Sequence, residues 1–231
     1  MATQTSTPAR ITKKQVPLLY SWIAPTHDIL AFFVESKARD RAIELAAIDE
    51  GERILEVAVG TGLSFQYVLQ KNTTGHNTGI DLTPAMLKKA KKRAQRIIRR
   101  HKLPINQYSL EIGDAYELGF PDAHFDLVLN SYMFDLLPED HFVPVLREFL
   151  RVLKPGGRLI QMNMTHGKNW YNHLWEGLYR IHPTLLGGCR CISTLEAMQQ
   201  AGFVNVHREY ISQWTFPSEV IRSERSITYT P

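Results

Sequence analysis

The chain has 231 residues, of which 44% are hydrophobic and 22% are charged, with a formal net charge of +4. This profile suits one domain with a full core, and no apolar run reaches the 18 residues that a membrane span requires. The start, MATQTSTPARITKKQVPLL, lacks the apolar core of a secretory signal, and Cys189 and Cys191 are too close in sequence for a disulfide framework. We therefore expect a cytoplasmic protein with a flexible N-terminus over 1–15 and a single domain over 16–231.

The charge is unevenly distributed. Between Pro84 and Leu103 there are nine basic residues and no acidic one, so the rest of the chain has five more acidic than basic residues. The nine are Lys88, Lys89, Lys91, Lys92, Arg93, Arg96, Arg99, Arg100 and Lys102. We expect no nucleic-acid partner, because no aromatic side chains for base stacking and no RNA-binding motif accompany the run. Two interpretations remain for residues 88–102: a solvated helix face, or a peripheral contact with an anionic membrane.

Apolar strands alternate with amphipathic helices, which predicts a parallel sheet with helices on both faces. In the N-terminal half we expect a helix at 27–48, a strand at 53–59, a helix at 62–71, a strand at 77–82, a helix opened by Thr83 and Pro84, and strands at 107–112 and 125–130. In the C-terminal half we expect a helix at 139–153, a strand at 158–164 after the turn signal KPGG, a helix at 193–201, a strand at 203–211 and a short final strand.

A glycine-rich loop follows the first predicted strand, in the segment LEVAVGTGLSF at 55–65. Gly60 and Gly62 lack a Cβ atom, so a ligand can approach the main chain there, and the helix that follows favours negative groups. A tight turn that binds nothing is the alternative. Phe65 occupies the third glycine position of the dinucleotide pattern G-x-G-x-x-G, which argues against a nicotinamide dinucleotide and for a smaller ligand.

Two carboxylates follow at the ends of the next two strands. Asp81 ends the strand in GIDLT, where a carboxylate can accept hydrogen bonds from both ribose hydroxyls of an adenosine. Asp114, in EIGDAYEL, stands where it can accept from an adenine amino group. Since the carboxyl ends of parallel strands meet at one edge of the sheet, the two aspartates and the glycine loop together predict a nucleoside pocket.

Four segments occur in the order of a known family: ILEVAVGTGLS, GIDLTPAMLKKAKKRA, GDAYELGFPDAHFDLVLNSYMFDLLP and LREFLRVLKPGGRLI. The chain resembles the class I S-adenosylmethionine-dependent methyltransferases from about Tyr20 to about Gln213. It is most similar to the branch of ubiquinone/menaquinone C-methyltransferases and phosphatidylethanolamine N-methyltransferases, whose N-terminal signature YSWIAPTHD matches. The segment NWYNHLWEGLYRIHPTLLGGC also resembles the methyltransferase-like thiol S-methyltransferases.

The resemblance implies an α/β fold, namely a Rossmann-like seven-stranded mostly parallel sheet with helices on both faces. It also implies S-adenosyl-L-methionine as methyl donor, with no metal. The donor site that it implies comprises Tyr20, His27, Glu56, Gly60, Gly62, Asp81, Leu82, Asp114, Ala115 and Asn130. Two positions depart from the family: His27 stands where tyrosine is usual, and Ala58 replaces a glycine. We expect the Ala58 methyl group to narrow the approach to the methionine end of the donor.

The acceptor side is less specified. Residues 166–190 resemble an acceptor-side insert, and their aromatic side chains suit either core packing or an apolar lid. These are Trp170, Tyr171, Trp175 and Tyr179, with Leu178 beside them. The candidate catalytic residues are His166 and Tyr132, and His141 and Asp135 are further possible bases. The spacing of Cys189 and Cys191 does not match a structural zinc site.

These features favour methyl transfer to a small, hydrophobic acceptor, with thiol S-methylation first. C-methylation of a quinone precursor and N-methylation of a phospholipid head group are the alternatives within the class. A nicotinamide oxidoreductase and a non-catalytic nucleotide-binding module are the alternatives outside it. The sequence does not decide the oligomeric state.

Overall fold

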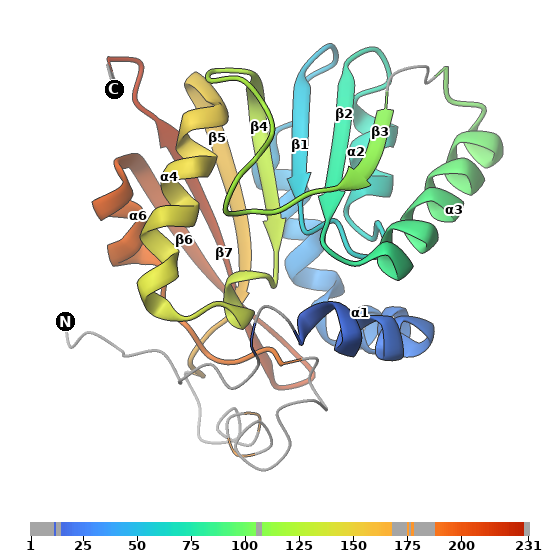
Figure 1. The fold of residues 1–231 in the computed structure, drawn as a ribbon, viewed down its shortest axis with the longest axis horizontal. Helices are drawn as coiled ribbons and strands as arrows, with labels where there is room; N and C mark the ends of the chain where they lie inside the picture. Colours follow the sequence, from blue (N-terminus) through green and yellow to red (C-terminus); the bar gives the residue numbers. More distant parts are fainter. Residues whose placement is uncertain are drawn as a thin grey trace.

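The structure is a computed structural model that describes residues 12, 15–104, 108–167, 175, 177 and 188–228. Its centre is a seven-stranded sheet in the order β3-β2-β1-β4-β5-β7-β6 (Figure 1). The strands are β1 (Arg53–Val57), β2 (His76–Asp81), β3 (Tyr108–Ile112), β4 (Phe125–Ser131), β5 (Leu153–Met164), β6 (Phe203–Gln213) and β7 (Phe216–Arg225). The predicted seven-stranded, mostly parallel α/β sheet is confirmed.

Strands β1 to β5 are parallel, and β7 is antiparallel to both β5 and β6. The chain first runs outward from β1 to β3 and then returns to place β4 on the other side of β1. This reversal of strand order lies between β1 and β4, and ligands of open α/β sheets bind at the carboxyl ends of the strands at such a point.

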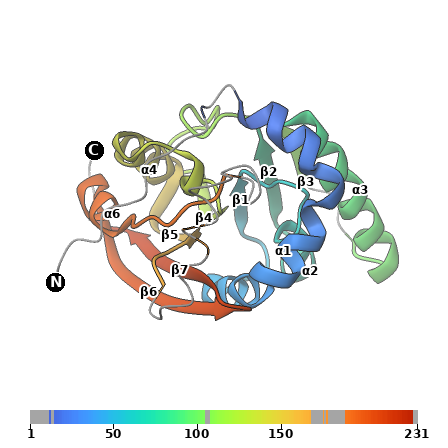
Figure 2. The same ribbon diagram turned by 90° about the horizontal axis from the view of Figure 1, so that it is seen from below.

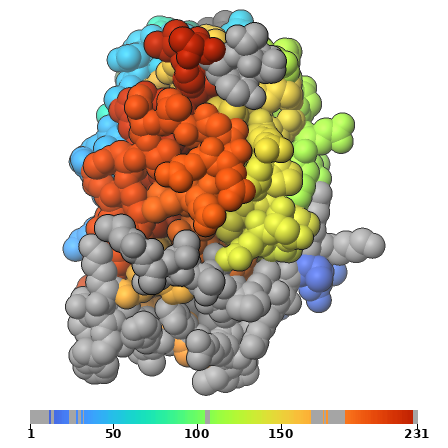
Figure 3. Space-filling model, turned by 90° about the vertical axis from the view of Figure 1, so that its left-hand side faces the viewer, coloured from blue at the N-terminus to red at the C-terminus, as the bar shows by residue number. Residues whose placement is uncertain are grey.

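Helices cover both faces of the sheet (Figures 1 and 2). They are α1 (Val16–Ala46), α2 (Phe65–Lys71), α3 (Pro84–His101), α4 (Phe142–Val152) and α6 (Leu195–Ala201), with 3-10 turns η1 (Phe134–Leu136) and η2 (Glu139–His141). The core of one face joins α4 and α6 to the sheet, and that of the other face joins the C-terminal half of α1 to it. A third cluster joins α2 and α3 to β3. In Figure 3, α6 and β6 (orange) lie beside α4 (yellow) on one outer surface.

Several predicted boundaries were wrong, and each has a local cause. Helix α1 begins at Val16, 11 residues before the predicted start, and continues past Pro25. Strand β1 ends at Val57 because Ala58 turns into the left-handed region at φ +57°. The KPGG segment belongs to β5, where the register with β4 shifts between Phe125 and Leu127, so these residues form a bulge and not a turn before the strand.

Candidate functional site

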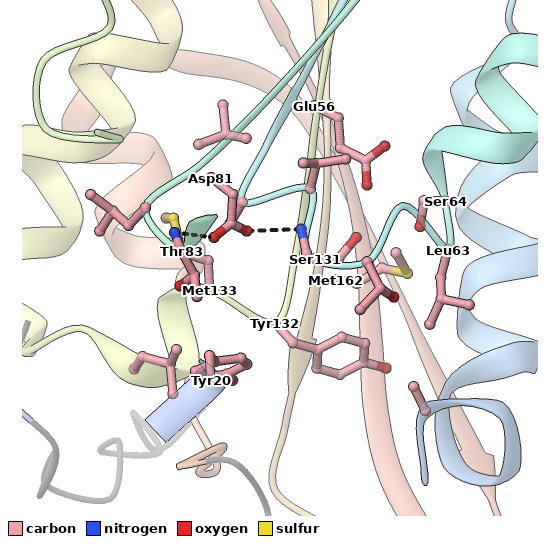
Figure 4. A pocket seen from close by; sticks show the side chains of 18 of the residues that line it. Tyr20, Glu56, Leu63, Ser64, Asp81, Thr83, Ser131, Tyr132, Met133 and Met162 are labelled. Atoms are coloured by element: carbon pink, nitrogen blue, oxygen red, sulfur yellow. Dashed lines mark hydrogen bonds between the residues drawn. The ribbon is translucent and has the colours of Figure 1, made fainter. Parts of the chain in front are cut away.

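A cavity opens at the carboxyl ends of β1, β2 and β4, beneath the N-terminal half of α1 (Figure 4). Among the described residues, it is lined by Val16, Tyr20, Ile23, Ala31, Glu35, Arg39, Glu56, Val57, Ala58, Val59, Gly60, Thr61, Leu63, Ser64, Asp81, Leu82, Thr83, Gly113, Ala115, Ser131, Tyr132, Met133, Leu136, Met162 and Cys189. The strand ends that the sequence singled out therefore meet at one cavity.

Asp81 joins the strand end to the glycine loop. One carboxylate oxygen accepts from the Gly60 N–H at 2.8 Å, and the other accepts from the Thr83 N–H at 2.8 Å (Figure 4). Thr83 is the N-cap residue of α3, as predicted, but its side chain makes no capping hydrogen bond, and its own N–H donates to Asp81. A carboxylate has about four acceptor positions, so Asp81 retains capacity for the hydroxyl groups of a ligand.

The two loop glycines differ in what surrounds them. Both have positive φ, +55° at Gly60 and +80° at Gly62. A Cβ added to Gly62 would lie 3.3 Å from the Cα and Cβ atoms of Ala90 in α3, whereas one added to Gly60 would meet no protein atom within 4 Å. Gly62 thus permits close packing of α3, and Gly60 presents its backbone to the cavity. Gly62 itself does not line the cavity.

Ala58 adopts a left-handed conformation that non-glycine residues avoid, and it lines the cavity. The glycine usual in the family would take this conformation without strain. The Ala58 methyl group therefore belongs to the wall of the pocket, and its effect on the methionine end of the donor stays a prediction.

Glu56 is a buried carboxylate without a full set of partners. It is 2% exposed, and its Oε2 atom has no hydrogen-bond partner among the described residues. Burial raises the pKa of Glu56 to about 8, while the Arg39 guanidinium lowers it and Asp81 raises it further. A buried acceptor that lacks a partner at the wall of a cavity is suited to a cationic or hydrogen-bonding group of a ligand.

The predicted adenine contacts divide into two groups. Leu82 and the buried Ala115 line the cavity. The Asp114 carboxylate accepts from the Tyr116 N–H at 3.1 Å and does not line the cavity. Asn130 does not line it either, because its amide nitrogen donates to the Val57 carbonyl at 3.0 Å and so ties the end of β4 to β1.

Helix α1 covers the cavity and is tied to the glycine loop. Tyr20 lines the cavity, and burial raises its pKa well above the usual value, with the neighbouring Cys189 adding to the shift. Asp28 accepts from the Thr61 hydroxyl at 2.5 Å and pairs with Arg93 of α3 at 2.5 Å. His27 belongs to α1, and its side chain lies outside the described part of the structure.

The end of the cavity opposite Glu56 is mostly apolar. In Figure 4, Tyr20 and Tyr132 lie across the cavity from Glu56. We use the name acceptor end for these two lining residues together with Ile23, Leu136, Met162 and Cys189. The Tyr132 hydroxyl is hydrogen-bonded to Ser218 on β7 at 2.8 Å, and burial raises the pKa of Tyr132 well above its usual value. Burial likewise raises the pKa of the Cys189 thiol. These groups are therefore protonated near neutral pH.

The other candidate bases are not among the described residues that line the cavity, although the Asp135 carboxyl group contacts the Cys189 thiol behind it. His166 follows β5, is half-buried, and is not among the described residues that line the cavity. His141 belongs to η2, and its ring Nδ1 atom lies 2.6 Å from the Tyr116 hydroxyl oxygen. Asp135 is fully buried and accepts from the Met164 N–H at 3.0 Å, and burial raises its pKa well above the usual value. Of the predicted insert at 166–190, Trp170, Tyr171, Leu178 and Tyr179 lie outside the described residues.

Sequence reasoning missed Glu35 and Arg39, which form a 3.4 Å ion pair at the cavity wall. Together with Val16, Tyr20 and Ile23 they follow helical spacing along one face of α1. The predicted helix began at residue 27, so Val16, Tyr20 and Ile23 were not recognised as part of this pattern. Two charged residues on an otherwise apolar inner face were the available signal.

Comparisons with known proteins agree with this geometry. A family model for the methyltransferase domain matches residues 54–157, from β1 into β5. Demethylmenaquinone methyltransferase of Listeria welshimeri is 30% identical over 152 residues, which cover 64% of this chain and 61% of that protein. This chain belongs to the class I S-adenosylmethionine-dependent methyltransferase family. The demethylmenaquinone methyltransferase of Tropheryma whipplei is 31% identical over 160 residues, 68% of this methyltransferase and 62% of the relative. The match thus spans less than two thirds of either relative's length.

Solved structures share the fold of this methyltransferase. The [4+2]-cyclase SpnF superimposes with a TM-score of 0.72 at 19% identity, over 97% of this chain and 100% of that one. A possible histamine N-methyltransferase from Thermotoga maritima superimposes with a TM-score of 0.68 at 18% identity, over 91% and 100% of the two chains. At these identities the likeness is one of fold.

Proposed function

We propose that the protein transfers the methyl group of S-adenosylmethionine to a small apolar acceptor, and that the preferred acceptor atom is a thiol sulfur. The donor would lie along the strand ends, with its ribose at Asp81 and its amino group near Glu56. The acceptor atom would attack the sulfonium methyl carbon in line with the breaking carbon–sulfur bond. Alignment of two bound substrates can supply roughly 7–11 kcal/mol of the barrier reduction.

The observation that carries this proposal is the chemistry of the acceptor end. Glu35 lines the same cavity, its charge acts on every titratable group of the acceptor end, and it is paired with Arg39 at 3.4 Å. Those titratable groups are Tyr20, Tyr132 and Cys189, and burial raises the pKa of each. None of these groups takes up a proton near neutral pH. An acceptor that needs no protein base therefore fits best, and a thiol ionises more readily than an alcohol, as the reference pKa of about 8.5 for cysteine illustrates.

A second candidate is C-methylation of a quinone precursor. It is favoured by the named activity of the relatives from Listeria and Tropheryma, and a flat apolar ring suits the same acceptor end. N-methylation of a phospholipid head group is less suited, because a charged head group would be desolvated among apolar side chains.

The test is transfer of labelled methyl from S-adenosylmethionine to a matched panel. The panel contains an apolar alkyl thiol, the alcohol and the primary amine of the same chain length, and a demethylated quinol. Turnover of the thiol at least tenfold above the alcohol and amine supports S-methylation. Selective turnover of the quinol moves the assignment to the second candidate, and donor binding without any turnover supports a non-catalytic module.

We also propose that α3 contacts an anionic membrane surface. Its exposed cations are Lys88, Lys91, Lys92, Arg96, Arg99, Arg100 and Lys102. The neighbouring α1, joined to α3 through Arg93 and Asp28, exposes 75% of Leu18 and 80% of Trp22. Basic residues beside exposed apolar side chains suit a peripheral contact that would deliver an apolar acceptor. No helix of the described residues meets the length and hydropathy needed to cross a bilayer.

Sedimentation with vesicles tests this contact. We expect binding to phosphatidylserine-containing vesicles that weakens with salt and is lost when Arg96, Arg99 and Arg100 are changed to Glu. Equal sedimentation with neutral vesicles, or binding to duplex nucleic acid instead, would contradict it.

A further inference from the structure

Helix α1 consists of two parts with different surroundings. Its C-terminal half packs on the sheet through the buried residues Val34, Ala38, Ala42, Ile43 and Ala46. Its N-terminal half, which we call the roof (16–32), contributes Val16, Tyr20 and Ile23 to the cavity. The helix changes direction along its length (Figures 1 and 2). Bends occur at proline residues, such as Pro25 within the roof, and where a side chain enters the hydrogen-bond ladder of a helix.

The side chain of Gln213 enters the ladder of α1 between the two halves. In an uninterrupted α-helix the Lys37 N–H donates to the Phe33 carbonyl four residues earlier. Here the Gln213 side-chain amide nitrogen donates to the Phe33 carbonyl at 2.7 Å, and its oxygen accepts from the Lys37 N–H at 2.7 Å. The hydroxyl of Ser36 also contacts the Gln213 amide nitrogen, at 2.9 Å. The side-chain amide of Gln213, on β6, is thus hydrogen-bonded to both the carbonyl and the N–H group that would otherwise pair with each other within α1.

The turn that holds Gln213 in place is strained. Trp214 and Thr215 connect β6 to β7, and both have positive φ, +50° and +64°. Two-residue hairpins of this kind favour Asn-Gly, since a bulky or β-branched residue is disfavoured at positive φ. The Thr215 hydroxyl also accepts from the Trp175 indole N–H at 3.0 Å. The same turn therefore contacts α1 and a residue of the predicted acceptor-side insert.

Polar contacts among the described residues tie the roof to the body of the protein, including a hydrogen bond between the Tyr20 hydroxyl and the Cys189 thiol. Two further contacts lie close to the bend and to the glycine loop. One is Gln213, and the other is Asp28, which contacts Thr61 of the glycine loop and Arg93 of α3. The C-terminal half of α1 is further fixed by the Arg41 pair with Glu209 at 2.7 Å. A rotation of the roof about residues 33–37 would therefore alter the cavity while leaving the sheet-packed half in place.

We propose that Gln213 is a positioning residue whose side-chain amide forms the hinge of the roof, holding α1 at the angle that closes Tyr20 and Ile23 over the bound substrates. The hydrogen bonds of Gln213 join the end of β6 to the backbone of α1 at the boundary between its two halves. The substrate role rests on the proposed methyl transfer, whereas the hinge itself is a property of the free protein.

Hydrogen–deuterium exchange of the full chain tests the hinge directly. Gln213→Met keeps the volume of the side chain and removes its hydrogen bonds, and Gln213→Ala removes both. We expect the amides of 16–32 to exchange about tenfold faster in both variants, the equivalent of losing one or two net hydrogen bonds. Amides of 38–46 should keep the wild-type rate. Asn205→Ala is the matched control, because it removes a 2.8 Å hydrogen bond from the same strand to Glu224 without touching α1.

Binding of S-adenosylhomocysteine, the demethylated donor, links the hinge to the site. It should slow exchange of 16–32 in the wild type, and its affinity should fall about tenfold in Gln213→Met with no change in Asn205→Ala. Unchanged exchange of 16–32 in Gln213→Met, or equal acceleration of 16–32 and 38–46, would overturn the hinge. If the wild type does not bind S-adenosylhomocysteine, the proposed function fails while the exchange comparison in the free protein still decides the role of Gln213.

Discussion

The two ends of the cavity are built in different ways. The donor end is made of strand termini, where Asp81 is fixed by backbone hydrogen bonds and Gly62 by its contact with α3. The acceptor end is covered by the roof, whose direction depends on one side-chain amide from a distant hairpin. Donor recognition therefore lies in short sequence motifs, while acceptor recognition depends on contacts between segments far apart in the chain. This difference explains why the donor is easier to assign than the acceptor.

The largest effect is expected from Asp81→Ala. This change removes the acceptor of the Gly60 and Thr83 N–H groups together with the predicted ribose contact. Hydrogen bonds to a charged group contribute about 1.5–3 kcal/mol each, so donor affinity should fall more than about 100-fold. Calorimetric titration with S-adenosylhomocysteine measures this affinity. The affinity of Asp81→Asn, which keeps the shape of the side chain, should lie between those of the wild type and Asp81→Ala. An affinity within threefold of wild type would show that the donor does not lie along β2.

The two loop glycines sharpen the comparison within the donor end. Gly62→Ala places a Cβ 3.3 Å from Ala90 in a left-handed conformation, so we expect about 2–3 kcal/mol lower stability. Gly60→Ala meets no protein atom, so it should cost only about 1 kcal/mol while its methyl group reduces donor affinity about tenfold. Denaturant unfolding and titration of both variants separate the two effects. Equal behaviour of the pair would contradict the distinction between a packing and a ligand-facing glycine.

Glu56 should give donor binding a dependence on pH. With its pKa at about 8, Glu56 is mostly protonated in the free protein at pH 7, and a cationic amino group bound beside it would favour the ionised form. Donor binding at pH 7 should therefore release close to one proton. Titrations in two buffers of different ionisation enthalpy measure this release, which Glu56→Gln should abolish.

The same carboxyl group affects the stability of the free protein. Glu56 ionises above about pH 4.5 when the chain is unfolded and only near pH 8 in the folded state. Between these values the folded state binds more protons, so stability falls as pH rises, by up to about 1.4 kcal/mol per pH unit. Glu56→Gln should flatten this slope. An unchanged slope would mean that another group determines it.

The smallest effect is expected from His166→Gln. His166 does not line the described cavity, and a thiol acceptor needs no protein base. We therefore expect kcat to change by less than about threefold, with the same pH profile, in the labelled-methyl assay. A loss of kcat of about 100-fold that grows at low pH would instead identify His166 as a general base.

Short-range patterns predicted the succession of strands and helices along the chain, because period-2 and period-3.6 hydrophobicity and turn residues are local. Asp81 and Gly60 could thus be placed at one cavity from the strand ends, whereas Glu56, Leu82 and Ala115 were implied by the family resemblance. The start of α1 and its inner charged residues could not, since Pro25 marks a helix boundary in most sequences.

Contacts that join distant segments carried no sequence signal. The hydrogen bonds from Gln213 to Phe33 and Lys37 connect residues 180 and 176 positions apart. Asn130 illustrates the same limit from the other side, because its expected place at the donor gave way to a contact with Val57 that depends on strand pairing. The predicted roles of His27 and most of the insert remain predictions.

Whether the cavity binds S-adenosylmethionine is decided by calorimetric titration of the wild-type protein with S-adenosylmethionine, and separately with NADH. We expect micromolar binding of S-adenosylmethionine with no measurable heat from NADH. Binding of NADH in its place, or no binding of S-adenosylmethionine, would contradict the methyl-donor site at the ends of β1 and β2.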